Sequence, residues 1–132
     1  MNFNIVKIGK VKNQFTEPVG PEEMEDIISE IIIKEKYADG LYKIEENQYI
    51  MVIFAFHLKE DKGYNLVGER RYDKKLGVFS SRSPRRPSSI GVTVVKLLSR
   101  DDNILKVKGL DAINETPVLD IKQFAENYDC PS

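Results

Sequence analysis

Three arginines lie close together in residues 77–91, GVFSSRSPRRPSSIG. Arg82 stands alone, and Arg85 and Arg86 are adjacent with a proline on either side of the pair. Prolines restrict the backbone, so that holding the guanidinium groups around an anion costs less entropy. Guanidinium groups suit phosphate and carboxylate ligands. The stretch indicates an anion site, and the alternative is a solvated surface turn, which charge clusters usually form.

A second basic cluster lies upstream in the segment ERRYDKK, where Arg70, Arg71, Lys74 and Lys75 occur within a few positions. The whole chain of 132 residues carries 20 Lys+Arg and 21 Asp+Glu, a formal net charge of -1. Since the chain has no excess of positive charge, any polyanion must be bound by a local patch. The two basic clusters together predict such a patch.

His57 is the only histidine, and it follows the apolar run YIMVIFAF. A lone histidine at a strand end is more often structural, but the mouth of a barrel is also where ligand-binding groups lie. Phe54, Phe56 and Phe79 could form a platform for a nucleobase, although packing in the core is the favoured interpretation.

Acidic residues occur close together near the C-terminus, at Asp111, Glu115 and Asp120, with Lys122 beside them. Such residues commonly cap turns or face water, and at a barrel mouth they could accept a proton. Asp120 and Lys122 share one face of a strand. A structural ion pair and a role in a site are equally compatible with this spacing.

Cys130 is the only cysteine, which excludes an intramolecular disulfide and a cysteine metal cluster. It has no neighbouring base in the sequence, so a nucleophilic role has little support. The N-terminal residues lack the apolar core of a signal peptide, and the longest apolar run is too short to span a bilayer. We therefore expect a cytoplasmic protein with no membrane segment and no metal.

Strand-like segments rich in Ile and Val dominate the chain. We expect strands at residues 3–9, 29–37, 49–58 and 116–124, a hairpin of residues 90–98 and 104–110, and a strand beginning at Val78 and Phe79. The run at 49–58 is nearly all apolar, which predicts a strand covered on both faces. Pro21, followed by Glu22 and Glu23, resembles a helix start.

Long amphipathic helices are absent from the pattern, as are a G-x-G-x-x-G fingerprint, a Walker loop and H-E-x-x-H. This disfavours a Rossmann methyltransferase or dehydrogenase. The sequence predicts a single domain over residues 1–132, mainly β, built as a small and mostly antiparallel β-barrel with short helical turns.

Two long motifs resemble those of the TsaA-like (TrmO-like) family. GVFSSRSPRRPSSIG is similar to the family pattern GVFATRSPxRPNPIG, and GLDAINETPVLDIKQF to G-x-D-L-x-D-G-T-P-V-x-D-I-K-P-Y. The segments IGKV and GLYKIEENQYIMVIFAFH are similar to the family's opening strand and its central block. The resemblance extends from about residue 5 to Asp129.

The resemblance implies a β-barrel that binds S-adenosylmethionine, usually as a homodimer, and that methylates N6 of threonylcarbamoyladenosine beside the anticodon of tRNA. Carried over by position, it places the cofactor against Pro21, Glu22, Glu23, His57, Leu58, Arg82, Ala112, Ile113, Asn114 and Glu115. In this interpretation Arg70, Arg71, Arg85 and Arg86 hold phosphates of the anticodon stem-loop. Asp120 assists removal of the proton from the nucleophilic nitrogen, and Lys122 orients Asp120.

The chain departs from the family pattern at several positions. Ser88 and Ser89 replace Asn-Pro, Asn114 and Glu115 replace Asp-Gly, and Gln123 replaces Pro. Two alternatives to a tRNA methyltransferase therefore stay open. One is a barrel that binds S-adenosylmethionine or RNA without catalysis, and the other is a methyltransferase acting on a small molecule.

Overall fold

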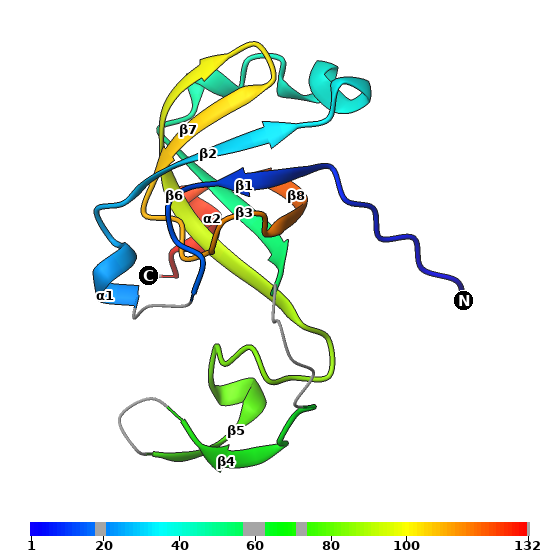
Figure 1. Ribbon diagram of the computed structural model, residues 1–132, viewed down its shortest axis with the longest axis vertical. Coiled ribbons are helices and arrows are strands. Elements are labelled where there is room, and N and C mark those ends of the chain that lie inside the picture. The colour runs from blue at the N-terminus through cyan, green and yellow to red at the C-terminus, as the bar shows by residue number, and fades with distance from the viewer. Residues whose placement is uncertain (18–20, 57–62, 71–73, 132) are drawn as a thin grey trace.

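A closed, antiparallel β-barrel forms the main body of the protein (Figure 1). The computed structural model describes residues 1–17, 21–56, 63–70 and 74–131. Around the barrel the strands follow the order β1-β2-β7-β6-β3-β8. Their bounds are β1 Gly9–Lys12, β2 Ile28–Ile33, β3 Tyr49–Ala55, β6 Ile90–Asp101, β7 Ile104–Lys108 and β8 Pro117–Gln123. The predicted fold class is confirmed.

The barrel interior is filled by alternate residues of each strand, since successive side chains of a strand point to opposite faces. On β3, Ile50, Val52 and Phe54 are buried, whereas the residues between them are half-buried. The other strands contribute the remaining core side chains, Val11, Ile31, Ile33, Val95, Leu105, Val107 and Val118. The predicted cover on both faces is therefore complete only on the inner face, and the outer face of β3 is partly covered, because a closed barrel has one interior.

In the part of the chain that the structure describes, helical structure is limited to short segments: α1 Pro21–Met24, η1 Glu35–Leu41, η2 Ile44–Glu46, η4 Val78–Ser80 and α2 Glu126–Asp129. The helix start at Pro21 and the short helical turns are thus confirmed. None of the described helices has the length and hydropathy needed to cross a membrane.

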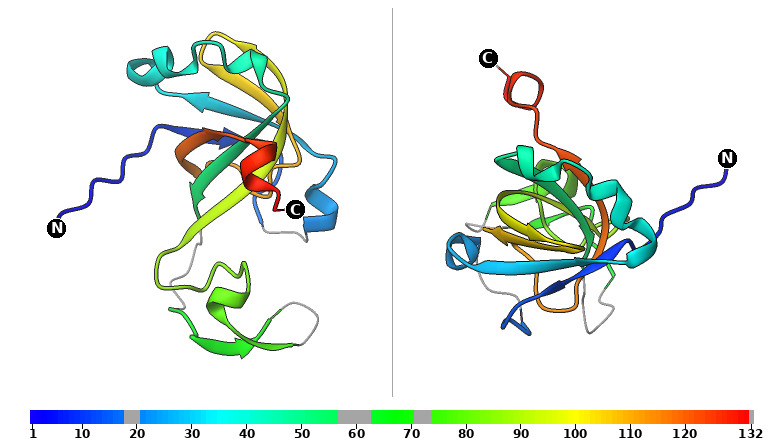
Figure 2. Two further views of the ribbon diagram at one scale, coloured as in Figure 1. Left: turned by 180° about the vertical axis from the view of Figure 1, so that it is seen from behind. Right: turned by 90° about the horizontal axis from the view of Figure 1, so that it is seen from above.

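Three predicted strands differ from the structure. The strand expected at residues 29–37 ends at Ile33, and the helix η1 begins at Glu35. Residues 1–7 are exposed and form no strand, and β1 begins only at Gly9, where pairing with both β2 and β8 becomes available. Viewed from above, this N-terminal segment projects away from the ring of strands (Figure 2). Val78 and Phe79 lie in the turn η4 instead of a strand, because the N–H and hydroxyl of Ser81 both bond the carbonyl of Val78.

A small lobe carries the basic sequence clusters and lies beyond one end of the barrel (Figure 1). We define the lobe as residues 63–70 and 74–89. It contains the antiparallel pair β4 Val67–Glu69 and β5 Lys75–Gly77, followed by η4 and the arginine stretch. In Figure 1, α1 lies toward the end of the barrel that faces the lobe, and η1 and η2 lie at the opposite end.

Candidate functional site

The turn of residues 112–115, which precedes β8, is held by β1 and by the segment that follows it. We call it the rim turn. The N–H of Asn114 donates to the carbonyl of Phe15 at 2.7 Å, and the N–H of Glu115 to the carbonyl of Val11 at 2.7 Å. Ala112 and Ile113 are buried. The four predicted cofactor residues of this segment therefore form one fixed turn.

Asn13 makes the largest number of contacts with the rim turn. Its side-chain amide donates to the carbonyl of Ala112 at 2.8 Å and to the hydroxyl of the buried Ser29 at 3.1 Å. Its Oδ1 accepts the N–H of Phe15 at 2.9 Å, and its own N–H donates to Oδ1 of Asn114 at 3.0 Å. Asn13 was not predicted as a site residue from the sequence. The only available signal was an Asn directly after a strand, where its side chain can cap the backbone two residues on.

Glu115 occupies the left-handed region with φ 73°, which favours glycine. Its carboxylate lies 3.5 Å from Nζ of Lys10 and 3.6 Å from Nζ of Lys12. Desolvation opposes ionisation of this carboxyl, but the charges of and hydrogen bonds from the two lysines outweigh it, so the pKa of Glu115 lies below its ordinary value. The two ion pairs stabilise the side chain of a glutamate at a position where the family pattern has glycine.

This pKa shift predicts a dependence of stability on pH. A carboxyl whose pKa is lowered by folding stabilises the protein above its ordinary pKa of 4.5, and the contribution disappears as the pH falls through the lowered value. We expect Glu115→Gln, which keeps the backbone strain, to lower the thermal midpoint at neutral pH and to lower it less at an acidic pH below 4.5. Thermal unfolding followed by circular dichroism measures both, with the exposed Glu46→Gln as control. A deficit that is the same at both pH values would contradict the account.

The arginines of the stretch differ in the hydrogen bonds that their guanidinium groups make. Nη1 of Arg86 donates to the carbonyls of Ser81 at 3.2 Å and Ser83 at 3.1 Å, so Arg86 braces its own loop. Arg82 is exposed and donates to the carbonyl of Val92 on β6. The guanidinium of Arg85 has no hydrogen bond or ion pair to another described residue. Arg85 is half-buried, and it is the arginine of the stretch whose guanidinium keeps its hydrogen-bonding capacity for an anion.

Arg70 lies on the lobe beside β4. Its Nη2 donates to the carbonyl of Asn65 at 2.6 Å, and its Nε is buried without a partner in the described part of the chain. Lys74 and Lys75 are exposed nearby. The predicted residues Arg71, His57 and Leu58 lie outside the described residues. Glu22 and Glu23 are exposed on α1, which also contains Pro21.

Asp120 and Lys122 lie on the outer face of β8, opposite Ile53 and Met51 of β3. Their charged groups are 3.3 Å apart, and Oδ1 of Asp120 accepts the N–H of Ile121 at 2.9 Å. The rim turn, by contrast, makes its hydrogen bonds with residues 11–15 and not with this ion pair. Both side chains are more than half exposed, and an exposed ion pair on the outside of a barrel needs no ligand to explain it, so the geometry favours the structural alternative for this pair.

The three phenylalanines have different environments. Phe54 is buried and Phe56 packs against the core, with the two rings edge-to-face at 5.5 Å. A Cβ at Gly91 would lie 2.7 Å from the Phe54 ring, so glycine is needed for this packing. Phe79 is 79% exposed on the lobe. The core interpretation is confirmed for Phe54 and Phe56 and was wrong for Phe79, because η4 turns its side chain into solvent.

The chain is similar in sequence to a known protein family and to several named proteins. The family model described as tRNA-methyltransferase O N-terminal domain matches residues 8–130. An S-adenosyl-L-methionine-binding protein of Archaeoglobus fulgidus is 40% identical over 93% of this chain and 90% of its own length. A tRNA (adenine(37)-N6)-methyltransferase of Mus musculus is 39% identical over 70% of this chain and 22% of its own length.

Solved structures show the same fold. A crystal structure of TrmO superposes over 100% of this chain with a TM-score of 0.80 and 26% identity. TrmO from Pseudomonas aeruginosa superposes with a TM-score of 0.78 and 25% identity. The chain spans 62% and 60% of the lengths of these two proteins.

Proposed function

The chain belongs to the family of the tRNA-methyltransferase O N-terminal domain, and on this premise we propose that it is an S-adenosylmethionine-dependent tRNA methyltransferase. Its expected substrate is N6 of threonylcarbamoyladenosine next to the anticodon. The observation that supports the proposal is that the rim turn, to which the motif resemblance assigns the cofactor, is held in place by hydrogen bonds in a barrel with the fold of TrmO.

The residues of the rim turn fit the proposed cofactor. When bound, S-adenosylmethionine supplies a methyl group that is already activated by a sulfonium. Positive charge on the sulfur is lost in the transition state, so a net negative site would favour the ground state. Lys10 and Lys12 offset the carboxylate of Glu115, so the turn presents no net negative charge. The task of this turn is therefore to hold and orient a ligand.

The lobe supplies the positive charge expected for RNA. Arg85, Lys74 and Lys75 are the side chains we assign to phosphate contacts, because they are not committed to ion pairs with described residues. Arg82 and Arg70 can join them, while Arg86 keeps the loop in shape. The ion pair of Asp120 and Lys122 is exposed on the outer face of β8, so the proposal assigns no proton transfer to it.

We also propose that the chain acts as a homodimer. Ile90, Val92 and Val94 on the outer face of β6 are exposed, and Met51 and Ile53 of β3 lie opposite Val94 and Val92 in the register. A contiguous apolar sheet face of this kind is typical of a subunit interface. A solution mass equal to one chain would exclude this part of the proposal.

Methyl transfer tests the function directly. Purified protein should transfer label from S-adenosylmethionine to tRNA that carries threonylcarbamoyladenosine. Arg85→Ala should lower kcat/KM for tRNA about threefold to tenfold and reduce the salt dependence of binding by about one phosphate contact, with affinity for S-adenosylmethionine unchanged. Lys106→Ala on β7, away from the lobe, serves as the matched control. No label in any tRNA would contradict the proposal.

A second candidate function is a barrel that binds S-adenosylmethionine without catalysis. The observation that favours it is that several archaeal relatives carry only the name of S-adenosyl-L-methionine-binding proteins. Saturable binding of the cofactor without label transfer to tRNA or small molecules would support this alternative. Transfer to a small molecule, unaffected by Arg85→Ala, would support the small-molecule methyltransferase.

A further inference from the structure

A groove of about 380 Å³ lies between η1–η2 and the C-terminal half of β8, at the end of the barrel opposite the lobe (Figure 1). Its floor is apolar and includes Ile44, Ile50 and Ile121. Its rim is polar and aromatic and is formed by Tyr37, Tyr42, Lys43, Asn47 and Gln123. We name this groove the tyrosine groove after the two tyrosines. An apolar hollow with a few polar groups at its edge is the usual form of a site for a small organic group.

Both tyrosines of the rim carry a lysine beside the ring. Nζ of Lys43 lies 5.6 Å from the centroid of Tyr42, and Nζ of Lys36 lies 5.2 Å from that of Tyr37. Tyr42 is 68% exposed, so its ring is available to a ligand. With the ammonium of Lys43 over one face of the Tyr42 ring, a base can stack on the other face while its phosphate meets the cation, which matches a nucleotide.

The rim also carries two side-chain amides. Nε2 of Gln123 donates to Oδ1 of Asn47 at 3.2 Å, and Nδ2 of Asn47 donates to the carbonyl of Ile44 at 3.2 Å. After these bonds the amide of Gln123 keeps its Oε1 and one N–H, and that of Asn47 keeps one N–H, which the edge of an unpaired base can use. The one acidic side chain of the groove, Asp120, is paired with Lys122, so the groove presents Lys43 as its unpaired charge.

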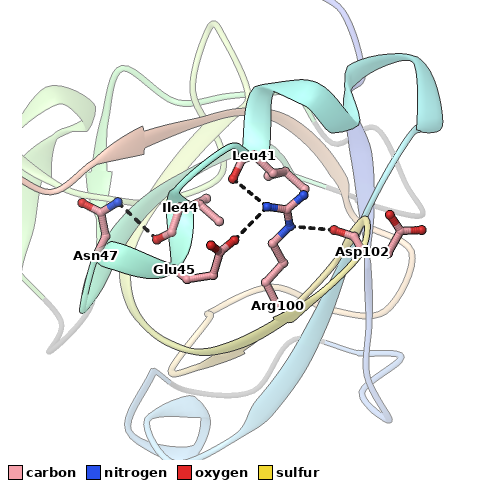
Figure 3. A network of polar contacts seen from close by, with 6 residues as sticks. All are labelled: Leu41, Ile44, Glu45, Asn47, Arg100 and Asp102. Atoms are coloured by element: carbon pink, nitrogen blue, oxygen red, sulfur yellow. Dashed lines mark hydrogen bonds and ion pairs between the residues drawn. The ribbon is translucent and has the colours of Figure 1, made fainter.

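Arg100 holds the backbone that carries Tyr42 and Lys43 (Figure 3). Its Nη1 donates to the carbonyl of Leu41 at 3.1 Å and to the carboxylate of Glu45 at 2.7 Å, while its Nε bonds the carbonyl of Asp102 at 2.8 Å. Arg100 thereby ties η1 and η2 to the turn between β6 and β7. A second hollow of about 500 Å³ on the Arg100 side also contains Tyr42 and Lys43, which form the ridge between the two.

Lys43 adopts a strained backbone conformation with φ 65°, in the left-handed region that glycine occupies without strain. Strain of this kind persists where the surrounding structure enforces it, and it is common at ligand sites. The side chain of Lys43 is exposed and has its Nζ over the Tyr42 ring. Packing therefore does not explain a lysine at this position, whereas a ligand phosphate would.

We propose that the tyrosine groove is a second RNA site that takes one unpaired nucleotide. The base stacks on Tyr42, the amides of Asn47 and Gln123 bond its edge, and Lys43 contacts its phosphate. This site lies at the end of the barrel away from the arginine stretch, so it extends RNA contact beyond the lobe. It requires no catalysis and stands independently of the proposed methyl transfer.

Binding of a fluorescein-labelled short oligoadenylate to the full chain tests this site. We expect Tyr42→Ala to weaken binding about tenfold, since loss of one base–aromatic stack has an effect of this order. Tyr128→Ala on α2, where the ring is 89% exposed, is the matched control and should leave the affinity unchanged. Because Tyr42 is exposed as well, neither substitution should impair folding.

A second variant separates a ligand role from a structural one. Lys43→Gly relieves the backbone strain, so it should raise the thermal midpoint while it weakens oligoadenylate binding at least threefold. A purely structural lysine would give the first effect without the second. Methyl signals of Ile44 and Ile121 should also shift when oligoadenylate is added.

Equal affinities of wild type and Tyr42→Ala would overturn the proposal, as would signal shifts confined to the lobe. Loss of methyl transfer with oligoadenylate binding intact would instead count against the proposed function alone. The two proposals can therefore fail separately.

Discussion

Gly9→Ala is expected to prevent the barrel from closing. A Cβ on Gly9 would lie 2.4 Å from the carbonyl oxygen of Ile32 and 3.1 Å from Cα of Ile33. Both are backbone atoms of β2, which cannot rotate away as a side chain can. Gly9 also pairs with Val118 of β8, so it lies at the seam where β1 joins its two neighbours. We expect a loss of about 3 kcal/mol or more, a large part of the stability of a domain of this size.

Urea unfolding followed by circular dichroism measures this effect, and Gly40→Ala provides the matched control. No atom lies within 4 Å of a Cβ at Gly40, so the control should change the free energy of unfolding by less than about 1 kcal/mol. An unfolding midpoint of Gly9→Ala equal to that of the control would show that β1 does not approach β2 as described.

Asn13→Ala should release the rim turn. The substitution removes two donated hydrogen bonds, to Ala112 and Ser29, and the bond accepted from Phe15. We expect the free energy of unfolding to fall by about 2 kcal/mol, because buried partners lose their bonds. If the turn holds S-adenosylmethionine, a turn that is no longer fixed should bind it about tenfold more weakly. This corresponds to a loss of about 1.4 kcal/mol of binding free energy.

Two further variants complete this test. Asn13→Asp keeps the acceptor for Phe15 but loses both donors, so its affinity for S-adenosylmethionine should be intermediate. Asn127→Ala, at an exposed position of α2, should have no effect on either property. If Asn13→Ala and Asn127→Ala bind the cofactor equally well, Asn13 stabilises the fold without positioning the site.

The strand-like segments were predictable from residue type and alternation. The hairpin of β6 and β7 follows from the apolar residues on either side of the turn, and Asp102 adopts a left-handed conformation there. Residues 3–9 have the same composition, but a strand exists only where a partner edge is available, and β1 starts where β2 and β8 both pair with it. Pairing of this kind is a property of the fold and is absent from local sequence.

The candidate site was predictable only in part. Motif resemblance located the rim turn and the arginine stretch, and the structure describes both. It could not distinguish Arg86, which bonds carbonyls of its own loop, from Arg85, because the two are chemically identical. Asn13 was missed because its contacts cross to residues about a hundred positions away in the chain. Such contacts leave no signal in a single sequence.

Calorimetric titration of the purified chain with S-adenosylmethionine tests the central claim most directly. The account predicts saturable binding at one site per chain, weakened by Asn13→Ala and unaffected by Tyr42→Ala on the opposite end of the barrel. Absence of binding heat for the folded protein at millimolar cofactor, with none recovered at a second temperature, would contradict it.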